Sequence, residues 1–312
     1  MMEDLREKRI WLTGGTGFLG QAVVAELKKQ QFHNILVTTH EEVDVGDVDQ
    51  IRHYLKEAQP QAIVHLAAVV GGIGANRERP AEFFYENMMM GTQLLHESWK
   101  SGVEKFVTIG TVCAYPKFVP IPFKEENLWD GYPEETNAPY GLAKKMLLVQ
   151  GQAYRQQYGF NSIYLLPVNL YGPGDNFDPA SSHVIPALIR KCLEAVESGS
   201  EVVEDWGDGS PTREIVYVED AARGIVAALR YYNGAEPVNL GSGMEISMRA
   251  LIEIIAEYTG FRGKLSWDTT KPNGQPRRCL DTSRAEQEFG FRATTDFREG
   301  LKHTIEWYKT QV

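Results

Sequence analysis

The stretch that decides the fold is Thr13-Gly14-Gly15-Thr16-Gly17-Phe18-Leu19-Gly20. A short apolar run at residues 9–12 precedes it, and residues 21–29 follow with the apolar spacing of a helix. Glycine lets backbone approach a diphosphate closely, and the N-terminus of the next helix offers free N–H donors and a positive dipole end. In this strand–turn–helix context the loop predicts dinucleotide binding, and a glycine-rich turn without a ligand is the alternative.

Outward from this loop, short apolar runs alternate with amphipathic stretches. Strands are expected at residues 9–12, 34–37, 62–66, 105–109 and 162–166. Helices are expected at residues 21–29, 47–58, 80–100 and 140–158. Strands that alternate with helices form a parallel sheet covered on both faces, and right-handed crossovers close it as a doubly wound sheet. The fold class is therefore predicted to be α/β, with a Rossmann-type doubly wound parallel sheet.

The alternation breaks up after residue 168. Residues 169–182 are rich in Gly, Pro, Asp and Asn and are expected to form a loop. Later elements are expected helices at 184–195, 221–231, 247–258 and 297–310, and a strand at 201–204. Ser247 is the candidate N-cap of its helix. Because no linker or repeat separates the halves, residues 1–168 are predicted to be mainly the nucleotide-binding domain. Residues 169–312 are predicted to form a smaller, mostly helical substrate lobe interleaved with it.

Composition excludes several classes of protein. The 312 residues are 43% hydrophobic and 24% charged, which is enough to bury a sizeable core. The formal net charge of −10 argues against general nucleic-acid binding but permits one phosphorylated ligand in a locally basic pocket. Cys113, Cys192 and Cys279 form neither a disulfide framework nor paired metal-ligand spacing. With no apolar signal-peptide core and no run of about 18 apolar residues, we expect a cytoplasmic protein without a metal or a membrane span.

The end of the second expected strand bears on the choice of cofactor. An acid there would bind the 2′-hydroxyl of NAD. The sequence instead reads Val37-Thr38-Thr39-His40, and small hydroxyls with a histidine can hold a 2′-phosphate, so NADP is predicted over NAD. Glu41 and Glu42 follow closely, which keeps NAD as an alternative. Asp44 either faces the adenine or is a solvated loop acid.

Tyr140 and Lys144 are four residues apart, which places them on one face of a helix with Cβ atoms about 5–6 Å apart. Pro139 suits the first turn, and Thr136 or Asn137 is the candidate cap. A nearby ammonium favours the phenolate, so we expect Lys144 to lower the pKa of Tyr140. The phenol could then exchange a proton with a sugar or alcohol oxygen near neutral pH.

A second hydroxyl is expected where the fourth strand runs into Gly110-Thr111-Val112-Cys113-Ala114-Tyr115-Pro116. Thr111 is the candidate to hydrogen-bond a substrate carbonyl. A threonine that caps a strand end, and a tyrosine–lysine pair on an ordinary helix surface, are the structural alternatives. The position of these residues after a glycine loop and four βα units favours the catalytic interpretation.

The glycine loop, Thr111, and Tyr140 with Lys144 resemble the extended short-chain dehydrogenases/reductases. Further motifs resemble the GDP-fucose synthases, which are GDP-4-keto-6-deoxy-mannose epimerase/reductases. These motifs are Ala67-Ala68-Val69-Val70-Gly71-Gly72-Ile73 with Ala75-Asn76 and Pro80, and residues 110–117, 182–188, 206–214 and 271–278. The resemblance therefore covers nearly the whole chain.

This resemblance implies a two-part reaction that yields GDP-L-fucose. Cys113 and His183 would act as acid and base, because a C4 ketone acidifies the hydrogens on C3 and C5 and inversion needs a proton removed from one face and returned on the other. Tyr140 and Thr111 would stabilise the enolate oxygen, and Tyr140 would donate the proton when NADPH reduces C4. Without the resemblance, Cys113 is interpreted as a small buried hydrophobe and His183 as structural.

The resemblance also implies the binding residues. Those around NADP are Gly14, Thr16, Gly17, Phe18, Leu19, His40, Asp44, Ala67, Tyr140, Lys144, Pro167, Asn169 and Leu170. Those around the GDP-linked sugar are Asn169, His183, Val184, Leu188, Lys191, Trp206, Arg213 and Arg278. Arg213 and Arg278 suit charge-assisted bonds to the diphosphate, and Trp206 suits packing on ribose or base. Lys191 is interpreted equally well as a solvated surface lysine.

Three positions depart from the family pattern. Val69 stands where lysine is common, Thr111 where serine is usual, and His40 where arginine often meets the 2′-phosphate. These departures leave open a related epimerase or reductase that acts on another GDP-linked keto-sugar. A non-catalytic NADP-binding sensor is the alternative from a different class.

Two other activities are disfavoured. A 4,6-dehydratase would carry an acid pair where Val112 and Cys113 stand, and a UDP-hexose 4-epimerase needs neither Cys113 nor His183. The long helices expected at 80–100 and 140–158 form the usual dimer surface in resembling enzymes. We therefore expect a homodimer.

Overall fold

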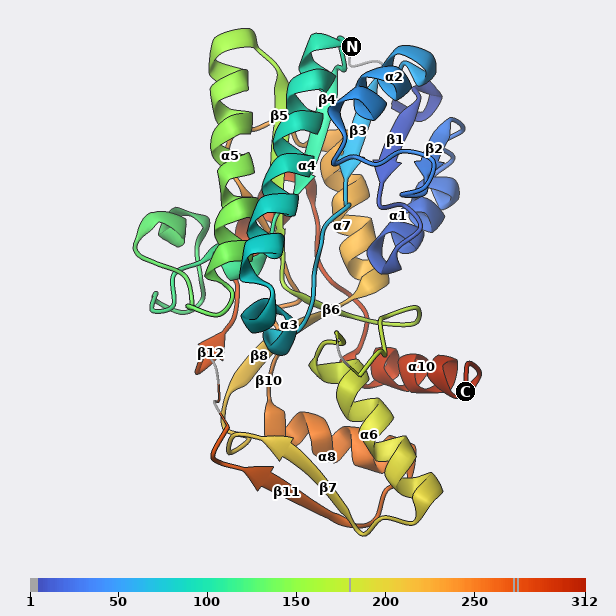
Figure 1. Cartoon of the computed structure of the whole chain (residues 1–312), viewed down its shortest axis with the longest axis vertical. Helices are drawn as coiled ribbons and strands as arrows, with labels where there is room; N and C mark the ends of the chain where they lie inside the picture. The colour runs from blue at the N-terminus through green and yellow to red at the C-terminus, as the bar shows by residue number, and fades with distance from the viewer. Residues whose placement is uncertain (1–4, 180, 272, 274) are drawn as a thin grey trace.

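The computed structural model describes residues 5–179, 181–271, 273 and 275–312. Figure 1 shows a large lobe built on a central sheet and a smaller lobe around α6, α8, β7 and β11. The central sheet is parallel, with strand order β2-β1-β3-β4-β5-β9. Its strands are β1 (Ile10–Thr13), β2 (Ile35–Thr38), β3 (Ala62–His65), β4 (Lys105–Ile109), β5 (Asn161–Pro167) and β9 (Val238–Leu240). The predicted α/β doubly wound sheet is confirmed.

Helices cover both faces of this sheet. One face carries α1 (Phe18–Lys29), α7 (Val218–Tyr231) and the short α9 (Ser283–Phe289); the other carries α2 (Val48–Ala58), α4 (Pro80–Lys100) and α5 (Ala138–Tyr158). Successive side chains of β1 serve opposite layers, because Ile10 and Leu12 pack with α1 and α7 while Trp11 packs with α2 and α4. All three are fully buried, as expected for a strand covered on both sides.

The smaller lobe has its own core. Its helices are α6 (Val184–Ser198), α8 (Met248–Thr259) and α10 (Phe297–Lys309). One small sheet joins β6 (Asn169–Tyr171), β8 (Thr212–Tyr217), β10 (Glu245–Ser247) and β12 (Arg277–Arg278), and another pairs β7 (Val202–Trp206) with β11 (Lys264–Asp268). Leu188, Leu251 and Ile255 lie among its fully buried apolar residues. Although α7 and β9 come late in the chain, they complete the large lobe.

Short elements complete the chain, and several differ from expectation. They are η1 (Leu5–Glu7), α3 (Ile73–Glu78), η2 (Val112–Ala114) and η3 (Glu125–Trp129). The expected loop at 169–182 contains strand β6, because these residues gain a ladder with β8, more than forty positions away in the chain. Strands of two to six residues that pair only at long range leave no periodic signal in the sequence.

Helix capping was predicted with mixed success. Ser247 caps α8 by accepting from the Ala250 amide, as expected. Neither expected cap of α5 operates in that way, because Asn137 makes no capping bond with its side chain and Thr136 donates its hydroxyl to Glu134 instead. Within the described residues, no helix is both long and apolar enough to cross a membrane.

The carboxyl edge of the central sheet is where a ligand site is expected in this type of fold. Strand order reverses between β1 and β3, so the chain leaves these neighbouring strands in opposite directions and opens a crevice at their ends. Gly20 sits at the start of α1 beneath this crevice. A Cβ on Gly20 would lie 2.1 Å from the Gly14 carbonyl oxygen, so only glycine lets helix and loop pack there.

Gly20→Ala should therefore destabilise the protein by about 2–3 kcal/mol, because the added methyl group overlaps the Gly14 backbone and forces α1 and the glycine loop apart. Gly74→Ala is the matched control, since a Cβ there meets nothing within 4 Å and alanine favours the α3 helix. Urea unfolding of both variants tests this. Equal stability of the two variants would contradict the packing role of Gly20.

Candidate active site

A cleft of about 1340 Å³ lies between the carboxyl edge of the central sheet and the smaller lobe. Every residue predicted to bind or react lines it, so the fold gathers segments from the whole chain. The lining includes Gly14, Thr16, Gly17, Phe18, Leu19, His40, Asp44, Ala67, Thr111, Cys113, Tyr140, Lys144, Pro167, Asn169, Leu170, His183, Val184, Leu188, Lys191, Trp206, Arg213 and Arg278. A cavity of this size can hold a dinucleotide and a nucleotide sugar together.

The glycine loop forms an anion cradle at one end. Gly14 has φ +70°, and a Cβ there would lie 2.7 Å from the Ala67 amide nitrogen, so this turn requires glycine. Gly17 is the N-cap of α1 and has no side-chain capping bond. A Cβ on Gly17 would meet only the Gly14 oxygen, at 3.4 Å, so the space above it is open to a ligand. These residues fit a diphosphate at the helix N-terminus.

Residues after β2 border the same end of the cleft. Thr38, Thr39, His40 and Asp44 line it, whereas Glu41 and Glu42 are not among its lining residues. The Glu42 carboxylate instead accepts from the Thr39 amide at 2.8 Å. The exposed His40 ring lies 3.6 Å from the Asp44 carboxylate. This arrangement favours a 2′-phosphate over a free 2′-hydroxyl, because no acid stands at the strand end facing the cleft.

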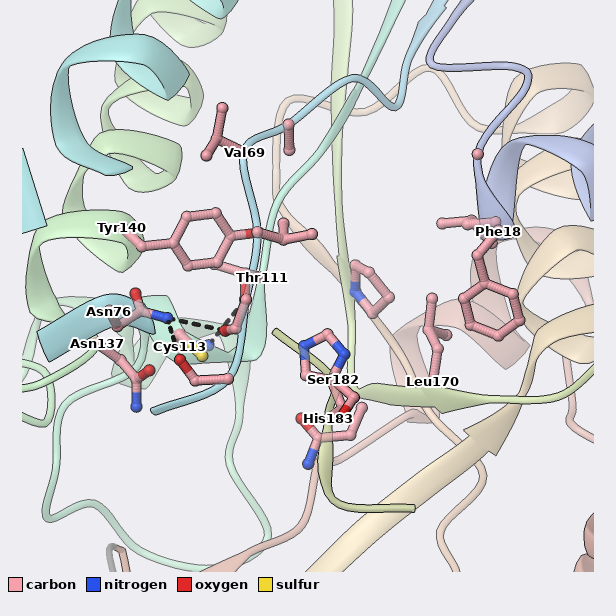
Figure 2. Close-up of a pocket in the computed structure, with 18 of the residues that line it drawn as sticks. Phe18, Val69, Asn76, Thr111, Cys113, Asn137, Tyr140, Leu170, Ser182 and His183 are labelled. Carbon is pink, nitrogen blue, oxygen red and sulfur yellow. Dashed lines mark hydrogen bonds between the residues drawn. The ribbon is translucent and has the colours of Figure 1, made fainter. Parts of the chain in front are cut away.

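The tyrosine and the cysteine are brought together by a glycine. Thr111 is the N-cap of η2, and its hydroxyl accepts from the Cys113 amide at 3.2 Å. Gly141 packs α5 directly on this turn, since a Cβ at that position would lie 2.3 Å from the Cys113 carbonyl oxygen. Tyr140 therefore stands beside Thr111 and Cys113 in the cleft (Figure 2). The close approach of two backbones, which Gly141 allows, thus fixes the positions of Tyr140, Thr111 and Cys113 relative to one another.

The expected lowering of the Tyr140 pKa by Lys144 is wrong. Burial raises the pKa of the Tyr140 phenol, nearby Cys113 raises it further, and the Thr111 hydroxyl lowers it by less. Burial also lowers the pKa of Lys144 to about 8, so its ammonium form is destabilised but still predominates at pH 7. The consequence is a protonated Tyr140 at neutral pH, which is the state of a proton donor.

His183 reaches the cleft from a different segment. It is the N-cap of α6, and the segment before it is held by the loop that follows β3, because the Gly72 amide donates to the Ser181 oxygen at 3.2 Å. Asn76 fixes that loop by donating to the Gly71 and Gly72 oxygens at 2.8 and 3.0 Å. The cleft walls lower the pKa of His183 by desolvation, so its imidazole is neutral and able to accept a proton.

The far end of the cleft holds two arginines. Arg213 on β8 and Arg278 on β12 are register partners, so they lie side by side. Burial and the charge of Arg278 lower the pKa of Arg213 to about 10. Arg278 donates from Nε and Nη2 to Gln275 Oε1 at 3.2 and 3.1 Å, and its Nη1 points at Cys113 Sγ at 3.9 Å. Two adjacent cations, Arg278 buried and Arg213 partly buried, favour an anionic ligand.

Two other predicted contacts differ in character. Trp206 is half exposed and stands with the Lys271 ammonium 5.7 Å from its ring centre, so its indole is free to pack on a ligand. Lys191 donates to the Glu204 oxygen at 3.1 Å and to the Asp205 carboxylate at 3.3 Å, so its charge is already compensated by the protein.

Several lining residues were not assigned a site role from the sequence. They are Asn76, Glu134, Asn137, Ser182 and Gln275. Asn76 and Gln275 lie inside motifs that were recognised, but a polar residue in a loop does not reveal which way it points. Val69 lines the cleft with its backbone bonded to Asn87 in both directions, at 3.1 and 2.9 Å. Within the described chain, no group of three or more His, Cys, Asp or Glu side chains is arranged to hold a metal.

The family profile described as the NAD dependent epimerase/dehydratase family matches residues 10–241, and the chain belongs to this family. The chain is 41% identical to GDP-L-fucose synthase 1 of Arabidopsis thaliana over 307 residues, which are 98% of this chain and 95% of that protein. A GDP-6-OMe-4-keto-L-xylo-heptose reductase from C. jejuni superimposes with TM-score 0.93 at 28% identity, covering 98% of this chain and 99% of that one. A GDP-L-fucose synthetase from Naegleria fowleri bound to NADP gives TM-score 0.88 at 29% identity, covering 97% and 94%.

The buried lysine makes a testable contribution to stability. The pKa of Lys144 is about 8 in the fold and has its ordinary value of 10.5 in the unfolded chain. Between these values the unfolded chain binds more protons, so the penalty for the buried ammonium is full below about pH 8 and fades as the pH rises. Lys144→Met should thus exceed the wild type in stability at about pH 7, without cofactor, by up to about 3 kcal/mol.

This advantage should shrink to about 1 kcal/mol or less by about pH 10 and vanish only above the unfolded pKa of 10.5, where the lysine is neutral in both states. Urea unfolding of both proteins at the two pH values measures the difference. A difference that does not change with pH would show that Lys144 is not a buried, perturbed cation.

Proposed function

We propose that this protein converts GDP-4-keto-6-deoxy-D-mannose to GDP-L-fucose, by 3,5-epimerisation followed by NADPH-dependent 4-reduction. The observation that carries the proposal is that one cleft joins two sets of groups. Tyr140, Thr111 and Lys144 suit reduction of a ketone, while Cys113 and His183 suit proton exchange at the neighbouring carbons. The sequence relationship to GDP-L-fucose synthases supports the same reaction.

The cofactor end fits NADPH. Gly14, Gly17 and the N-terminus of α1 would hold the diphosphate, and His40 with Thr38 and Thr39 would meet the 2′-phosphate. Bound NADPH supplies the hydride for C4. Lys144 is buried beside this region and would orient the ribose and nicotinamide by donating hydrogen bonds.

At the sugar end, a neutral His183 can remove a proton from C3 or C5, and the Cys113 thiol can return one from the other side. Tyr140 and Thr111 would donate hydrogen bonds to the C4 oxygen while negative charge collects on it. During reduction the protonated Tyr140 would give its proton to that oxygen. Arg213 and Arg278 would hold the diphosphate, with Trp206 against the nucleoside.

One observation favours a second candidate, a reductase of another GDP-linked keto-sugar. Val69 presents an apolar side chain to the cleft where resembling enzymes commonly carry lysine. The C. jejuni protein, whose name describes a GDP-keto-heptose reductase, shares the fold closely. A reductase of this kind would use Tyr140 and the arginine pair but not the exchange of protons by Cys113.

The proposal is tested with purified protein, NADPH and GDP-4-keto-6-deoxy-D-mannose in D₂O. We expect loss of nicotinamide absorbance, and NMR should show GDP-L-fucose with deuterium at C3 and C5. Cys113→Ser and His183→Asn should each slow deuterium incorporation by at least about 100-fold, because acid–base groups contribute about 10²–10⁴. Cys279→Ser is the control, since Cys279 is partly buried and does not line the cleft.

A reduced but unepimerised sugar without deuterium would overturn the roles of Cys113 and His183 and select the reductase. Tight NADP binding with no turnover of any keto-sugar would select a sensor.

We further propose a homodimer that works in the cytoplasm. Outside the cleft, α4 and α5 expose Phe84, Val149 and Tyr158, at 41%, 43% and 44%. Two copies could bury these side chains in a four-helix interface. The cysteines Cys113, Cys192 and Cys279 are unpaired thiols, in keeping with a reducing compartment.

Val149→Arg should convert the dimer to a monomer, because it places a charge in the apolar interface. Val196→Arg is the matched control, since Val196 is 46% exposed on α6, outside the proposed surface. Light scattering at micromolar concentration measures the mass. A wild-type monomer, or dissociation of both variants alike, would contradict the interface.

A further inference from the structure

A buried tyrosine lies two residues after Cys113 on the same turn. The Tyr115 hydroxyl donates to Asn239 Oδ1 at 2.7 Å, and both residues are almost completely buried. The Tyr115 ring also packs against Phe123, with ring centres 5.2 Å apart. Neither Tyr115 nor Asn239 lines the cleft, so neither can touch a substrate held there. Their hydrogen bond instead ties the Cys113 turn to β9, the last strand of the central sheet.

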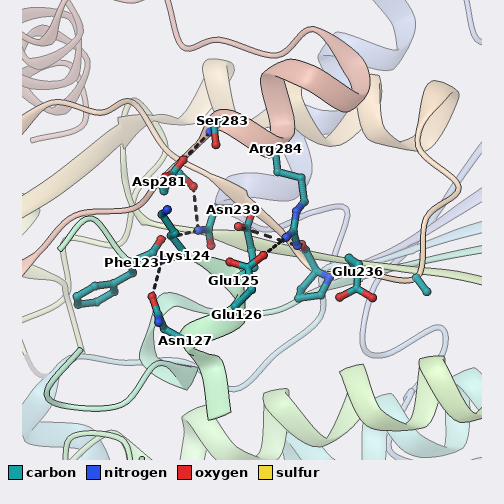
Figure 3. Close-up of polar contacts among 12 residues, drawn as sticks. Phe123, Lys124, Glu125, Glu126, Asn127, Glu236, Asn239, Asp281, Ser283 and Arg284 are labelled. Atoms are coloured by element: carbon teal, nitrogen blue, oxygen red, sulfur yellow. Dashed lines mark hydrogen bonds and ion pairs between the residues drawn. The ribbon is translucent and has the colours of Figure 1, made fainter. Parts of the chain in front are cut away.

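Asn239 uses its remaining polar atoms to hold a second segment (Figure 3). Its Nδ2 donates to the Asp281 oxygen at 2.9 Å and to the Phe123 oxygen at 3.0 Å. Its backbone amide donates to the buried Glu125 carboxylate at 2.9 Å. One amide side chain thus accepts from the turn that carries Cys113 and donates to the segment that follows Arg278.

The segment after Arg278 is fixed from both sides. Phe123 donates its amide to the Cys279 oxygen at 2.8 Å and accepts from the Asp281 amide at 2.9 Å. On the opposite side, the buried Glu214 carboxylate accepts from the Leu280 amide at 2.5 Å. Arg278 therefore has little freedom to move along its strand. Its Nη1 lies 3.9 Å from Cys113 Sγ as the result of bonds made elsewhere.

We propose that Asn239 is a positioning residue for epimerisation. Through Tyr115 and Asp281 it fixes the Cys113 turn against the strand that carries Arg278, so that the thiol and the arginine-bound diphosphate keep one separation. This inference rests on the proposed function, because it assigns Cys113 to proton exchange at the sugar. Hydride transfer to C4 depends chiefly on the cofactor, which the glycine loop holds without Asn239. Because α5 and Thr111 also contact the Cys113 turn, we expect reduction to slow, but by less than proton exchange.

The physical reason is the sensitivity of proton transfer to distance. A displacement of about 1 Å in a reacting group can cost about 100-fold in rate. In the joint formed by Tyr115, Asn239 and Asp281, the Tyr115 and Asn239 side chains are buried and their polar atoms are satisfied, so the joint has one low-energy arrangement. Removal of one bond would allow the Cys113 turn to shift relative to Arg278 without exposing the core.

The test uses Tyr115→Phe, which removes one hydroxyl and keeps the ring, and Asn239→Ala, which removes the whole joint. Tyr232→Phe is the matched control. Tyr232 is equally buried, donates its hydroxyl to the Glu236 oxygen at 2.7 Å and does not line the cleft. For each protein we would measure thermal unfolding, NADP affinity, deuterium exchange at C3 and C5 of the keto-sugar with NADP⁺ present, and product composition with NADPH.

We expect Tyr115→Phe and Tyr232→Phe to lose similar stability and to keep wild-type NADP affinity. Exchange at C3 and C5 should fall about tenfold in Tyr115→Phe, and further in Asn239→Ala, but remain unchanged in Tyr232→Phe. With NADPH, the Tyr115→Phe product should contain more reduced but unepimerised sugar. Equal slowing of exchange and reduction, or exchange no slower than in Tyr232→Phe, would overturn the proposal. Tyr115→Phe carries this decision whether or not Asn239→Ala folds.

A second readout separates this proposal from the function on which it rests. If the wild type does not exchange the sugar protons, the proposed function fails. The rate at which iodoacetamide alkylates Cys113 then tests the positioning role of Asn239 independently of that function. That rate depends on access to the thiol and on the charge beside it, both of which the Arg278 contact sets. A rate in Tyr115→Phe that differs at least about threefold from wild type, with Tyr232→Phe unchanged, supports the positioning role. An unchanged rate overturns it.

Discussion

The whole site depends on two places where a helix backbone packs directly against a loop backbone, with no side chain between them. Gly20 allows α1 to rest on the Gly14 carbonyl, and Gly141 allows α5 to rest on the Cys113 carbonyl. Each contact brings a helix N-terminus or its first turn to the open edge of the sheet. Without them, the anion cradle and Tyr140 would be displaced by the width of a methyl group, and the cleft would lose both its cofactor end and its proton donor. Two positions without side chains therefore set the geometry for every polar group around them.

The smaller lobe depends on this edge in turn, because the chain crosses between the lobes several times. After β5 it enters the small lobe, it returns as α7 and β9, and it leaves again through β10 and α8. Segments that begin or end at the central sheet consequently line both sides of the cleft. The Asn239 joint belongs to the same design, since a residue of the last sheet strand fixes the approach of β12. The two ends of the cleft face each other because the chain passes repeatedly between the lobes.

Sequence reasoning predicted the long helices and the strands of the central sheet except β9, because glycine spacing and apolar periodicity are local signals. Most residues of the cleft came from the resemblance to GDP-fucose synthases. Sequence reasoning did not predict β6, β8, β10 or β12, whose pairings join positions far apart, as Arg213 and Arg278 do. It misjudged the pKa of Tyr140, since the burial that raises this pKa is a property of the packed fold. It also passed over Asn239, because a single buried amide has no pattern around it. What escaped prediction is therefore what depends on contacts between distant segments.

The charge distribution follows from the same constraint. The chain carries a formal net charge of −10, yet its cleft holds Arg213 and Arg278 side by side and Lys144 in a buried position. Burial lowers the pKa values of Arg213 and Lys144, so the protein spends folding stability to keep cations out of water. An anion that enters relieves this penalty, whereas a neutral sugar does not. Desolvation of these cations therefore gives the cleft a selectivity for anions that does not depend on attraction at the acidic surface. The acidic exterior adds to this selectivity, because it repels polyanions that cannot reach the arginine pair.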